Sequence, residues 1–531
     1  MPLQTSVLSP YFSQRRVVTK PATRSKGGIV VSQNRVASEA GARVLKAGGH
    51  AVDAAVATSM VLGVVEPAMS GIGGVGAMLM RDGKSGAITA LDFGAVSPRA
   101  LDPGDYPVID GHDTNLFGWA QVKDNRNTVG ATAVCTPTLP LGLALAHKMF
   151  GRKRWRDLLA PVIAEAEAGL AVDWHLMLTI ATALGTLRAD PGAAARFLRH
   201  GLPPPLYNAT PDGLPVRLPM PELVRTLKAL AEDGAEALYK GPLAHAIAAD
   251  IKALGGCLAI DDLAHARAVE VAPLSIVYGD HTVHVAPELN GGPTLAVAYG
   301  ELQRLRKRPE SKPNGKTFVA YATALQYAWA DRYKRLGDAG ERSAPTCTSH
   351  FSVVDRAGNM VTCTQTLLSL FGASVVLPKS GILMNNGINW FDPRGGPNGI
   401  APGRRALANY APAIMTGGGA TVAIGGSGGR KIIPAVFQLL ALMADFDIDL
   451  DAAFEQPRVD VSGGSAVGID RRMDANTREA LAEKFDTVLM EPVPHPFPFT
   501  FASAVRRVRG QNEGATEPQH AWAEAVAEDD V

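Results

Sequence analysis

This sequence contains few cysteines, almost no net charge and no long apolar run. Four of the 531 residues are cysteines, and their positions fit neither a metal-ligand spacing nor a disulfide framework. Lysine and arginine number 52 against 51 acidic residues, so no strong field favours a nucleic acid or a membrane surface as a partner. The longest apolar run, residues 55–65, is too short to span a bilayer. We therefore expect a cytoplasmic protein from a reducing compartment, with no metal, nucleic acid or membrane among its partners.

A secretion signal is also missing from the first 26 residues, which are basic and irregular in pattern. They contain no continuous apolar stretch that leads to a small-residue cleavage site. We therefore expect an unprocessed, irregular arm over residues 1–26.

The rest of the chain has the composition of a large globular domain, with 46% apolar and 19% charged residues. Helical and hairpin patterns alternate without an internal repeat, which predicts an α+β fold with sheets layered between helices. Ser38 is the expected N-cap of a helix that ends at Gly48, and the small apolar residues at 51–65 predict an interior helix. Two glycine-rich loops, GIGGVG and GGSGGRK, lack the spacing of nucleotide-binding loops, so no cofactor is expected.

A cluster of small hydroxyl residues precedes a predicted hairpin at residues 343–366, SAPTCTSHFSVVDRAGNMVTCTQT. A threonine hydroxyl is a weak nucleophile unless a base lies within hydrogen-bond reach. The α-amine of an N-terminal threonine, with a pKa of about 8, is such a base. Thr348 would gain this amine if its hydroxyl attacked the Cys347 carbonyl and the resulting ester were hydrolysed. The alternative is that Thr348 merely opens a strand.

This segment resembles the start of the small subunit in the γ-glutamyltransferase family, whose members are N-terminal-nucleophile (Ntn) hydrolases that cut themselves before a threonine. Other similar segments occur in order, including AGGHAVDAAVATSMVLGVVEPAMSGIGG, ALQYAWADR, SGILMNNGINWFDP, APGRRALANYAPAIM and GGSGGRKIIPAVFQ. The resemblance implies a four-layer αββα sandwich in one intertwined domain. It also implies a large subunit at residues 27–347 and a small subunit at residues 348–531 from one precursor, with a dimer of this pair left open.

The resemblance further implies roles for individual residues. Thr348 matches the nucleophile, and Thr366 matches a second threonine that hydrogen-bonds the first and helps to activate it. The bond between Cys347 and Thr348 matches the cleavage site. Gly428 and Gly429 match a glycine pair whose backbone N–H groups form an oxyanion hole, and such donors stabilise a tetrahedral oxyanion by several kcal/mol. The alternative for this pair is a plain turn.

The sequence departs from the glutathione-acting members of the family where those members hold a γ-glutamyl group. They place an arginine, an asparagine, a polar residue, an acid and a serine pair at the positions that are occupied here by Gly94, Leu368, Gly387, Trp390, Ala408 and Asn409. A charged substrate group without its partner costs several kcal/mol to bury. We therefore predict poor binding of γ-glutamyl compounds and hydrolysis of another small acyl amide.

Candidate substrate-binding residues lie in the same segments. Trp390, Leu368 and Phe371 predict a flat, apolar acyl pocket. Asn409, Tyr410 and Arg404 are further candidates, and Arg404 and Arg405 could bind a substrate carboxylate or form structural ion pairs. Three alternatives stay open: transfer to an amine in place of water, a genuine γ-glutamyltransferase or glutathione hydrolase, and a non-catalytic binding protein that keeps the fold.

Overall fold

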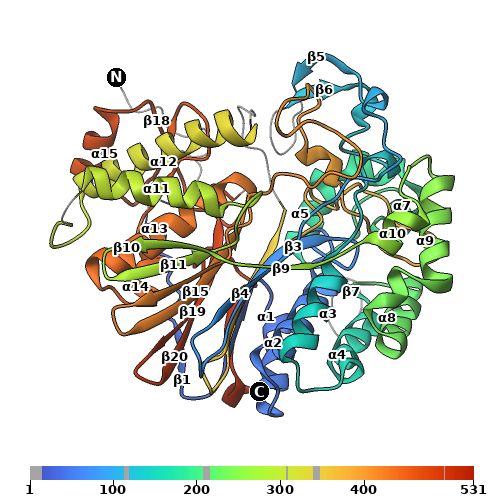
Figure 1. The fold of residues 1–531 in the computed structure, drawn as a ribbon, viewed down its shortest axis with the longest axis horizontal. Helices are drawn as coiled ribbons and strands as arrows, with labels where there is room; N and C mark the ends of the chain where they lie inside the picture. Colours follow the sequence, from blue (N-terminus) through green and yellow to red (C-terminus); the bar gives the residue numbers. More distant parts are fainter. Residues whose placement is uncertain are drawn as a thin grey trace.

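Two antiparallel sheets form the centre of the molecule (Figure 1). The computed structural model describes residues 13, 15–112, 119–206, 216–306, 309–338, 347–495 and 497–531. The first sheet has the strand order β21 (Glu524–Ala527), β2 (Ile29–Ser32), β12 (Ser349–Val354), β13 (Met360–Thr366), β3 (Val75–Arg81), β4 (Ile88–Phe93), β9 (Val269–Val271). The second has the order β1 (Thr23–Ser25), β20 (Gln511–Thr516), β19 (Phe501–Val508), β15 (Ala420–Ser427), β14 (Ala413–Gly417), β11 (His281–Val285), β10 (Leu274–Tyr278).

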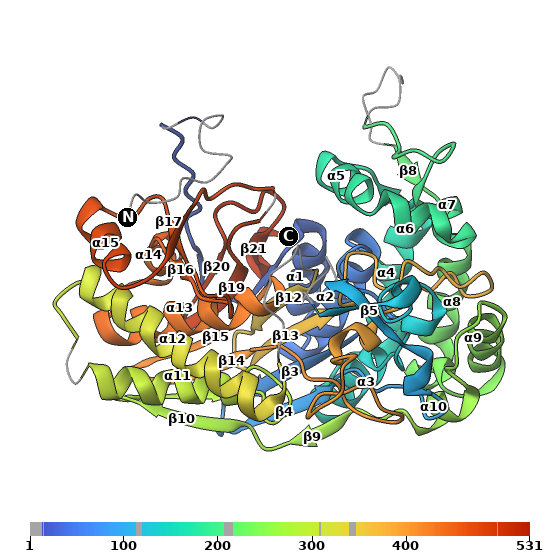
Figure 2. The same ribbon diagram turned by 90° about the horizontal axis from the view of Figure 1, so that it is seen from above.

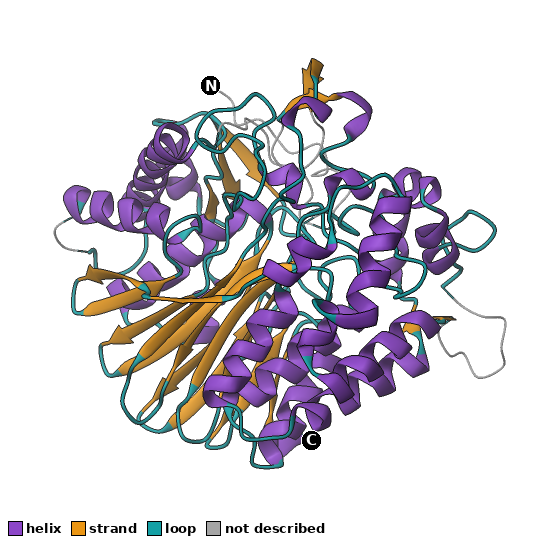
Figure 3. Ribbon diagram, turned by 45° about the vertical axis from the view of Figure 1, so that its right-hand side comes forward, coloured by secondary structure: helices purple, strands orange, loops and turns teal. Residues whose placement is uncertain are grey.

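Helices cover the outer face of each sheet, so the molecule has four layers (Figure 3). The first sheet is covered by α1 (Arg35–Lys46), α2 (Ala51–Val65) and α3 (Leu139–Phe150), and α4 (Trp155–Ala168) packs on α2. The second is covered by α11 (Gly292–Leu305), α13 (Ile432–Phe446) and α14 (Leu450–Glu455), and α12 (Gly315–Leu336) packs on α11. This is the αββα sandwich that the sequence predicts.

Smaller elements extend the helical layers on both sides (Figure 2). Beyond α4 lie α5 (Trp174–Thr182), α6 (Leu184–Ala189), α7 (Pro191–Phe197), α8 (Pro221–Asp233), α9 (Gly241–Ala253) and α10 (Ile260–His265). Beside α12 lie α15 (Ala475–Ala482) and a small sheet of β16 (Val459–Asp460), β17 (Val467–Asp470) and β18 (Thr487–Met490). Two short pairs remain, β5 (Val108–His112) with β6 (Ala120–Val122), and β7 (Leu170–Ala171) with β8 (Arg217–Leu218). In the part of the chain that the structure describes, no helix combines the length and apolarity needed to cross a membrane.

Three apolar clusters fill the spaces between the layers. One lies between α1–α4 and the first sheet, one between the second sheet and α11–α13, and one between the two sheets. Helix α2 is buried along nearly its whole length, as its small apolar residues predict. Its N-terminus is closed by a capping box in which His50 accepts from the helix backbone and Asp53 accepts the His50 N–H.

Two expectations about the N-terminal region need correction. The first helix begins at Arg35 and its N-cap is Asn34, which accepts the Val36 N–H at 3.0 Å. Ser38 lies inside that helix, and its hydroxyl donates to the Glu524 carbonyl of β21. The arm is not irregular throughout, because Thr23–Ser25 forms β1 and pairs with β20. Residues 1–12 and 14 of the predicted arm lie outside the described residues.

The predicted hairpin at residues 349–366 is confirmed as β12 and β13. It lies in the middle of the first sheet, with β12 paired to β2 and β13 paired to β3. Strands from both sides of residue 348 therefore alternate in one sheet, and Thr348 stands at the entrance of a fully buried strand.

Candidate active site

Thr348 lies directly before β12 and is almost completely buried. Its hydroxyl is hydrogen-bonded to the carbonyl oxygen of Cys347, the preceding residue in the uncut chain, and lies 3.3 Å from the Thr366 hydroxyl on β13. Thr366 Oγ1 donates to the same Cys347 carbonyl at 2.8 Å and accepts the Leu368 N–H at 2.8 Å. Two threonine hydroxyls therefore converge on one peptide carbonyl.

This convergence suits attack by the Thr348 hydroxyl on the Cys347 carbonyl carbon. The N–H of Leu368 occupies an acceptor position of Thr366, and the Thr366 hydroxyl donates its own proton to the Cys347 oxygen. A donor on that oxygen polarises the carbonyl and stabilises the negative charge that attack would place there. The geometry can thus support self-cleavage before Thr348.

The sheet register places further positions on the same face as Thr366. Val75 of β3 pairs with Thr366 of β13. The next residue of β3, Gly76, pairs with Phe93 of β4, and Gly94 directly follows Phe93. Thr366, Val75 and Gly94 therefore lie side by side across adjacent strands. His350, two residues along from Thr348, lies against Gly425 of β15 in the second sheet. Because side chains alternate along a strand, the face that carries Thr366 points into the space between the two sheets.

Several polar contacts hold the segment around Thr348, and sequence reasoning did not identify them. Ser427, at the end of β15, donates its hydroxyl to the Thr348 carbonyl. The Ser349 hydroxyl accepts from Ser70 at 2.9 Å, and Ser70 in turn accepts from Gln365 Nε2 at 3.0 Å. The one available signal was the position of Ser427 inside GGSGGRK, next to the predicted glycine pair.

The Cys347 side chain is packed among backbone carbonyls. Its thiol lies 3.0 Å from Ala68 O, 3.2 Å from Met69 O and 2.9 Å from Ser369 O. Burial raises the pKa of this thiol, so it stays neutral and acts as a weak donor. Cys347 is therefore held on both its carbonyl and its side chain.

Gly428 and Gly429 follow Ser427 directly and precede α13. Their φ angles are 140° and 56°, which fall in the region that glycine adopts most easily. The hydrogen bond from Ser427 to the Thr348 carbonyl places this segment beside the Thr348 backbone. Helix α13 begins shortly after the glycine pair, and the N–H groups at its start carry a partial positive charge. The oxyanion role of the pair stays a prediction.

Trp390 and Tyr410 form an aromatic wall in the cluster between the sheets. Their ring centroids are 5.1 Å apart, and both side chains are buried. Within the described residues the Tyr410 hydroxyl has no hydrogen-bond partner, and burial, together with nearby Asp92, raises its pKa, so it remains a donor. Leu368 belongs to the same cluster, but Phe371 packs against Phe197 on the helical side of the sheet, 4.8 Å between centroids. The predicted apolar pocket therefore lacks Phe371.

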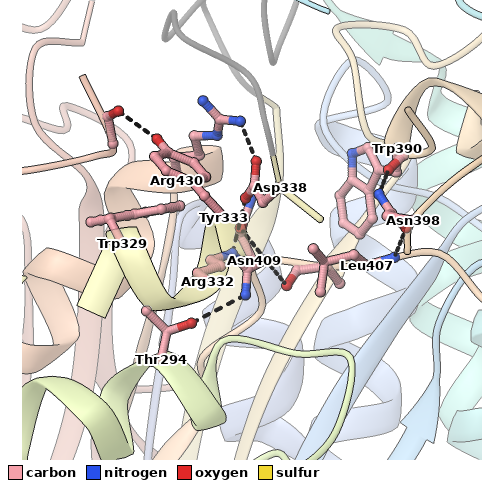
Figure 4. Close-up of polar contacts among 12 residues, drawn as sticks. Thr294, Trp329, Arg332, Tyr333, Asp338, Trp390, Asn398, Leu407, Asn409 and Arg430 are labelled. Atoms are coloured by element: carbon pink, nitrogen blue, oxygen red, sulfur yellow. Dashed lines mark hydrogen bonds and ion pairs between the residues drawn. The ribbon is translucent and has the colours of Figure 1, made fainter. Parts of the chain in front are cut away.

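The remaining candidates make contacts within the protein. Asn409 is buried, and its Oδ1 accepts from Arg332 Nη2 at 2.8 Å (Figure 4). Arg404 is exposed, and its guanidinium donates to the carbonyls of Pro397 and Gly399. The substrate-binding roles of both residues stay predictions.

The second arginine of the pair, Arg405, forms an ion pair with Asp92. Its Nη1 lies 3.2 Å from the point where a side chain at Gly94 would begin. A guanidinium from a neighbouring loop thus fills the space that the absent side chain leaves. The structural ion pair that the sequence left open is therefore present.

Histidines gather elsewhere, around His175, with ring centroids 6.1 Å from His520 and 6.5 Å from His495. Burial and the neighbouring His495 lower the pKa of His175 to about 4, so it is neutral near pH 7. Across the described ranges, no group of three or more histidine, cysteine or acidic side chains has the arrangement of a metal site.

Comparison with known proteins agrees with this geometry. The family model described as gamma-glutamyltranspeptidase matches residues 37–347 and 339–527. The acylase ACY 1 proenzyme of Pseudomonas sp. (strain V22) is 31% identical over 514 residues, which cover 89% of each chain. The glutathione hydrolase proenzyme of Pseudomonas sp. (strain A14) is 30% identical, over 82% of this chain and 81% of that one. The cephalosporin acylase structure from Bacillus halodurans superimposes with a TM-score of 0.82 at 23% identity, over 97% and 98% of the two chains.

Proposed function

We propose a reaction for this chain from the premise that it belongs to the γ-glutamyltranspeptidase family of Ntn hydrolases. The chain cuts itself between Cys347 and Thr348, and the new N-terminal threonine hydrolyses the amide bond of a small acyl amide. The observation that carries the proposal is the pair of threonine hydroxyls on the Cys347 carbonyl oxygen. Relatives whose names contain "proenzyme" support a precursor that yields a large and a small subunit.

In the proposed mechanism Thr348 Oγ1 forms a bond to the Cys347 carbonyl carbon, and the C–N bond breaks to leave an ester. The nitrogen of the broken C–N bond takes the hydroxyl proton and becomes the Thr348 α-amine, and water then hydrolyses the ester to give the Cys347 carboxylate and the free Thr348 hydroxyl. In later turnovers this amine takes the hydroxyl proton while Oγ1 attacks the substrate carbonyl. The N–H groups of Gly428 and Gly429 stabilise the oxyanion, and the substrate's amine takes the proton and leaves, so that its acyl group remains as an ester on Oγ1. Water then hydrolyses this ester and releases the acyl group as a carboxylic acid.

The acyl group that we propose is not γ-glutamyl. Trp390 and Tyr410 present aromatic surface, the buried Tyr410 hydroxyl offers a donor, and the Asn409 amide nitrogen offers another. Arg404 is exposed and is a candidate for a substrate carboxylate. The Arg405–Asp92 pair occupies the space beside Gly94, which supports a change of acyl specificity relative to the glutathione-acting members.

We place the reaction in the cytoplasm, because the four cysteines are unpaired and three of them are buried as thiols. Fractionation of cells that express the chain would test this, with the cytoplasmic fraction as the expected location.

Substitutions of Thr348 test the function. Thr348→Ala should abolish self-cleavage and lower amide hydrolysis by at least about 10³-fold, because the attacking oxygen is gone. Thr348→Ser should retain part of both, because serine keeps the hydroxyl. Gel electrophoresis gives the first result and release of the amine from a panel of N-acyl amides gives the second. Wild-type activity in Thr348→Ala would show that another residue is the nucleophile.

A further inference from the structure

Three charged side chains are buried together where α12 ends, before the chain reaches Cys347 (Figure 4). Arg332, Asp338 and Arg430 are each no more than 2% exposed. Arg332 Nε donates to Asp338 Oδ2 at 2.9 Å, and Arg430 Nη2 donates to Asp338 Oδ1. Burial opposes ionisation of Asp338, but the charges of Arg430 and Arg332 outweigh it and lower the pKa of the carboxyl.

Arg332 uses all three of its nitrogens on partners in the described structure. Besides Asp338, these partners are Asn290 O, Thr294 Oγ1, Ala408 O and Asn409 Oδ1. The last two lie 2.8 Å from Nη2 and belong to the segment that continues into Tyr410. A guanidinium has five N–H donors in one plane, so an ammonium group at this position would leave several acceptors without a donor.

Asp338 connects this arginine to a second segment near Thr348. Arg430 directly follows the Gly428–Gly429 pair, so its bond to Asp338 fixes the chain just beyond the two N–H groups. Asp338 is itself held in place by Gly337, which has a φ of 76°. A side chain at Gly337 would begin 2.9 Å from the Asn398 N atom, so only glycine fits.

Asn398 extends the connection to the aromatic wall. Its Nδ2 donates to the Trp390 carbonyl at 2.6 Å, and its Oδ1 accepts the Leu407 N–H at 3.2 Å. The end of α12 therefore contacts, directly or through one residue, each of the three segments that carry Trp390, Asn409 and the glycine pair (Figure 4).

We propose that Arg332 and Asp338 are positioning residues for the reaction at Thr348. Asp338 holds Arg430 and thereby fixes the position of the neighbouring Gly428–Gly429 pair. Arg332 holds Asn409 and thereby fixes the segment that continues into Tyr410 of the aromatic wall. The inference rests on the proposed function, because that function gives the two segments their roles. Both positioning residues precede the proposed cleavage site, and Asn409 and Arg430, the two residues that they hold, follow it. The end of the large subunit therefore sets the geometry of the small subunit's site.

Small displacements of such segments have large effects on rate. A misplacement of about 1 Å costs on the order of 10²-fold in rate, and loss of one oxyanion donor costs about 10²–10³-fold. Asp338→Asn keeps the shape but weakens the hold on Arg430, so kcat for each matured site should fall about 10–100-fold, with KM within threefold. Arg332→Lys loses the bonds to Ala408 and Asn409, so KM should rise about tenfold.

The matched control is Asp331→Asn on the same helix. Asp331 forms an ion pair with Arg335 at 3.0 Å, but on the exposed face of α12. Self-cleavage, kcat, KM and melting temperature are measured for all variants on the best amide substrate of the wild-type protein, with rates divided by the amount of matured chain. The control should keep all four values.

The positioning role is tested by whether kcat falls in Asp338→Asn and KM rises in Arg332→Lys. A purely structural role would lower the melting temperature or the yield of matured chain while both constants stay at wild-type values, and that result would overturn the positioning role. If Asp338→Asn does not fold or mature, Arg430→Lys is judged by the same kcat criterion. A wild-type protein that hydrolyses no amide of the panel would instead contradict the proposed function.

Discussion

At the scale of single residues, Thr366 has two neighbours that matter for chemistry. Its hydroxyl lies 3.3 Å from the Thr348 hydroxyl, as the resemblance implies, but its proton goes to the Cys347 carbonyl at 2.8 Å. In the uncut chain, Thr366 is therefore placed to stabilise the oxyanion of self-cleavage. The proposed cut would remove that carbonyl with the large subunit, and the same hydroxyl would then be available to Thr348.

Cys347 provides a test that separates self-cleavage from turnover. Cys347→Ala removes the thiol contacts with three carbonyls and loosens the residue that is attacked. A weak hydrogen bond is worth about 1 kcal/mol, so self-cleavage should slow about fivefold. Turnover of the matured enzyme should not change, because Cys347 has left the reacting centre. Time courses of precursor loss and kcat for each matured site measure the two effects.

The matched control for this substitution is Cys363→Ala. Cys363 is also a buried thiol, on β13, but it has no contact with the Cys347 peptide among the described residues. It should lower the melting temperature and leave the cleavage rate of the folded precursor unchanged. Equal cleavage rates for wild-type protein and Cys347→Ala would contradict the view that the thiol holds the scissile peptide.

At the scale of elements, the C-terminal end of α2 carries an ionisable group in an unusual state. Burial raises the pKa of Glu66 from 4.5 to about 8, although Asn34 Nδ2 donates to it at 3.5 Å. The unfolded chain loses this proton near pH 4.5, while the folded chain keeps it up to about pH 8. The free energy of unfolding should therefore fall as pH rises through this window, by up to about 1.4 kcal/mol for each pH unit.

Glu66→Gln should remove this pH dependence because glutamine has the same shape and no proton to lose. The variant should match the wild type near pH 5 and melt at a higher temperature at pH 8. Glu232→Gln, at an exposed position of α8, is the control. Thermal unfolding at the two pH values measures the effect, and a variant that is less stable than wild type at pH 8 would show that Glu66 is ionised in the fold.

Local sequence patterns predict elements well where they depend on residues close in the chain. The hairpin of β12 and β13, the interior helix α2 and the helix α12 have period and turn signals of their own. The prediction of Ser38 as the N-cap of α1 is wrong, because Ser38 and Asn34 are both good capping residues. Which of the two caps the helix depends on the contact of Ser38 with β21, a strand far away in the sequence. Strand β1 depends wholly on its partner β20, so no local pattern could indicate it.

The site shows the same limit. Thr348, Thr366 and the glycine pair could be named from motifs, and the structure brings the two threonines together. The Arg405–Asp92 pair, the Asp338 cluster and the place of Phe371 on the helical side all depend on residues far apart in the chain. Residues 339–346, between Asp338 and Cys347, lie outside the described residues.

At the scale of the whole molecule, the sheets join the two predicted subunits. In the first sheet, β12 and β13 of the small subunit lie between β2 and β3 of the large subunit, and in the second sheet β11 of the large subunit pairs with β14 of the small subunit. After cleavage before Thr348, the two chains would therefore stay together through the hydrogen bonds between paired strands and through the apolar clusters that both chains share. The cut chains should migrate together under native conditions and separate only after denaturation.

The proposed change of acyl specificity predicts which substrates the protein hydrolyses. γ-Glutamyl-p-nitroanilide and glutathione should be poor substrates, because each missing charge-assisted contact costs about 1.5–3 kcal/mol. Two or three such losses lower kcat/KM by about 10³-fold or more relative to an amide with an uncharged or singly charged acyl group. Steady-state rates on one matured preparation measure the ratio. Equal rates on glutathione and on the best alternative amide would identify a γ-glutamyl enzyme with a different pocket.

The N-terminal sequence of the smaller chain in an active preparation tests the central claim most directly. Purified protein is matured, separated on a denaturing gel and sequenced, with Thr348→Ala as the uncut control. Self-cleavage by Thr348 predicts two bands, near two-thirds and one-third of the full mass of 55.8 kDa, and a smaller chain that begins Thr-Ser-His-Phe. A preparation that hydrolyses amides while its chain stays a single intact band would contradict the account.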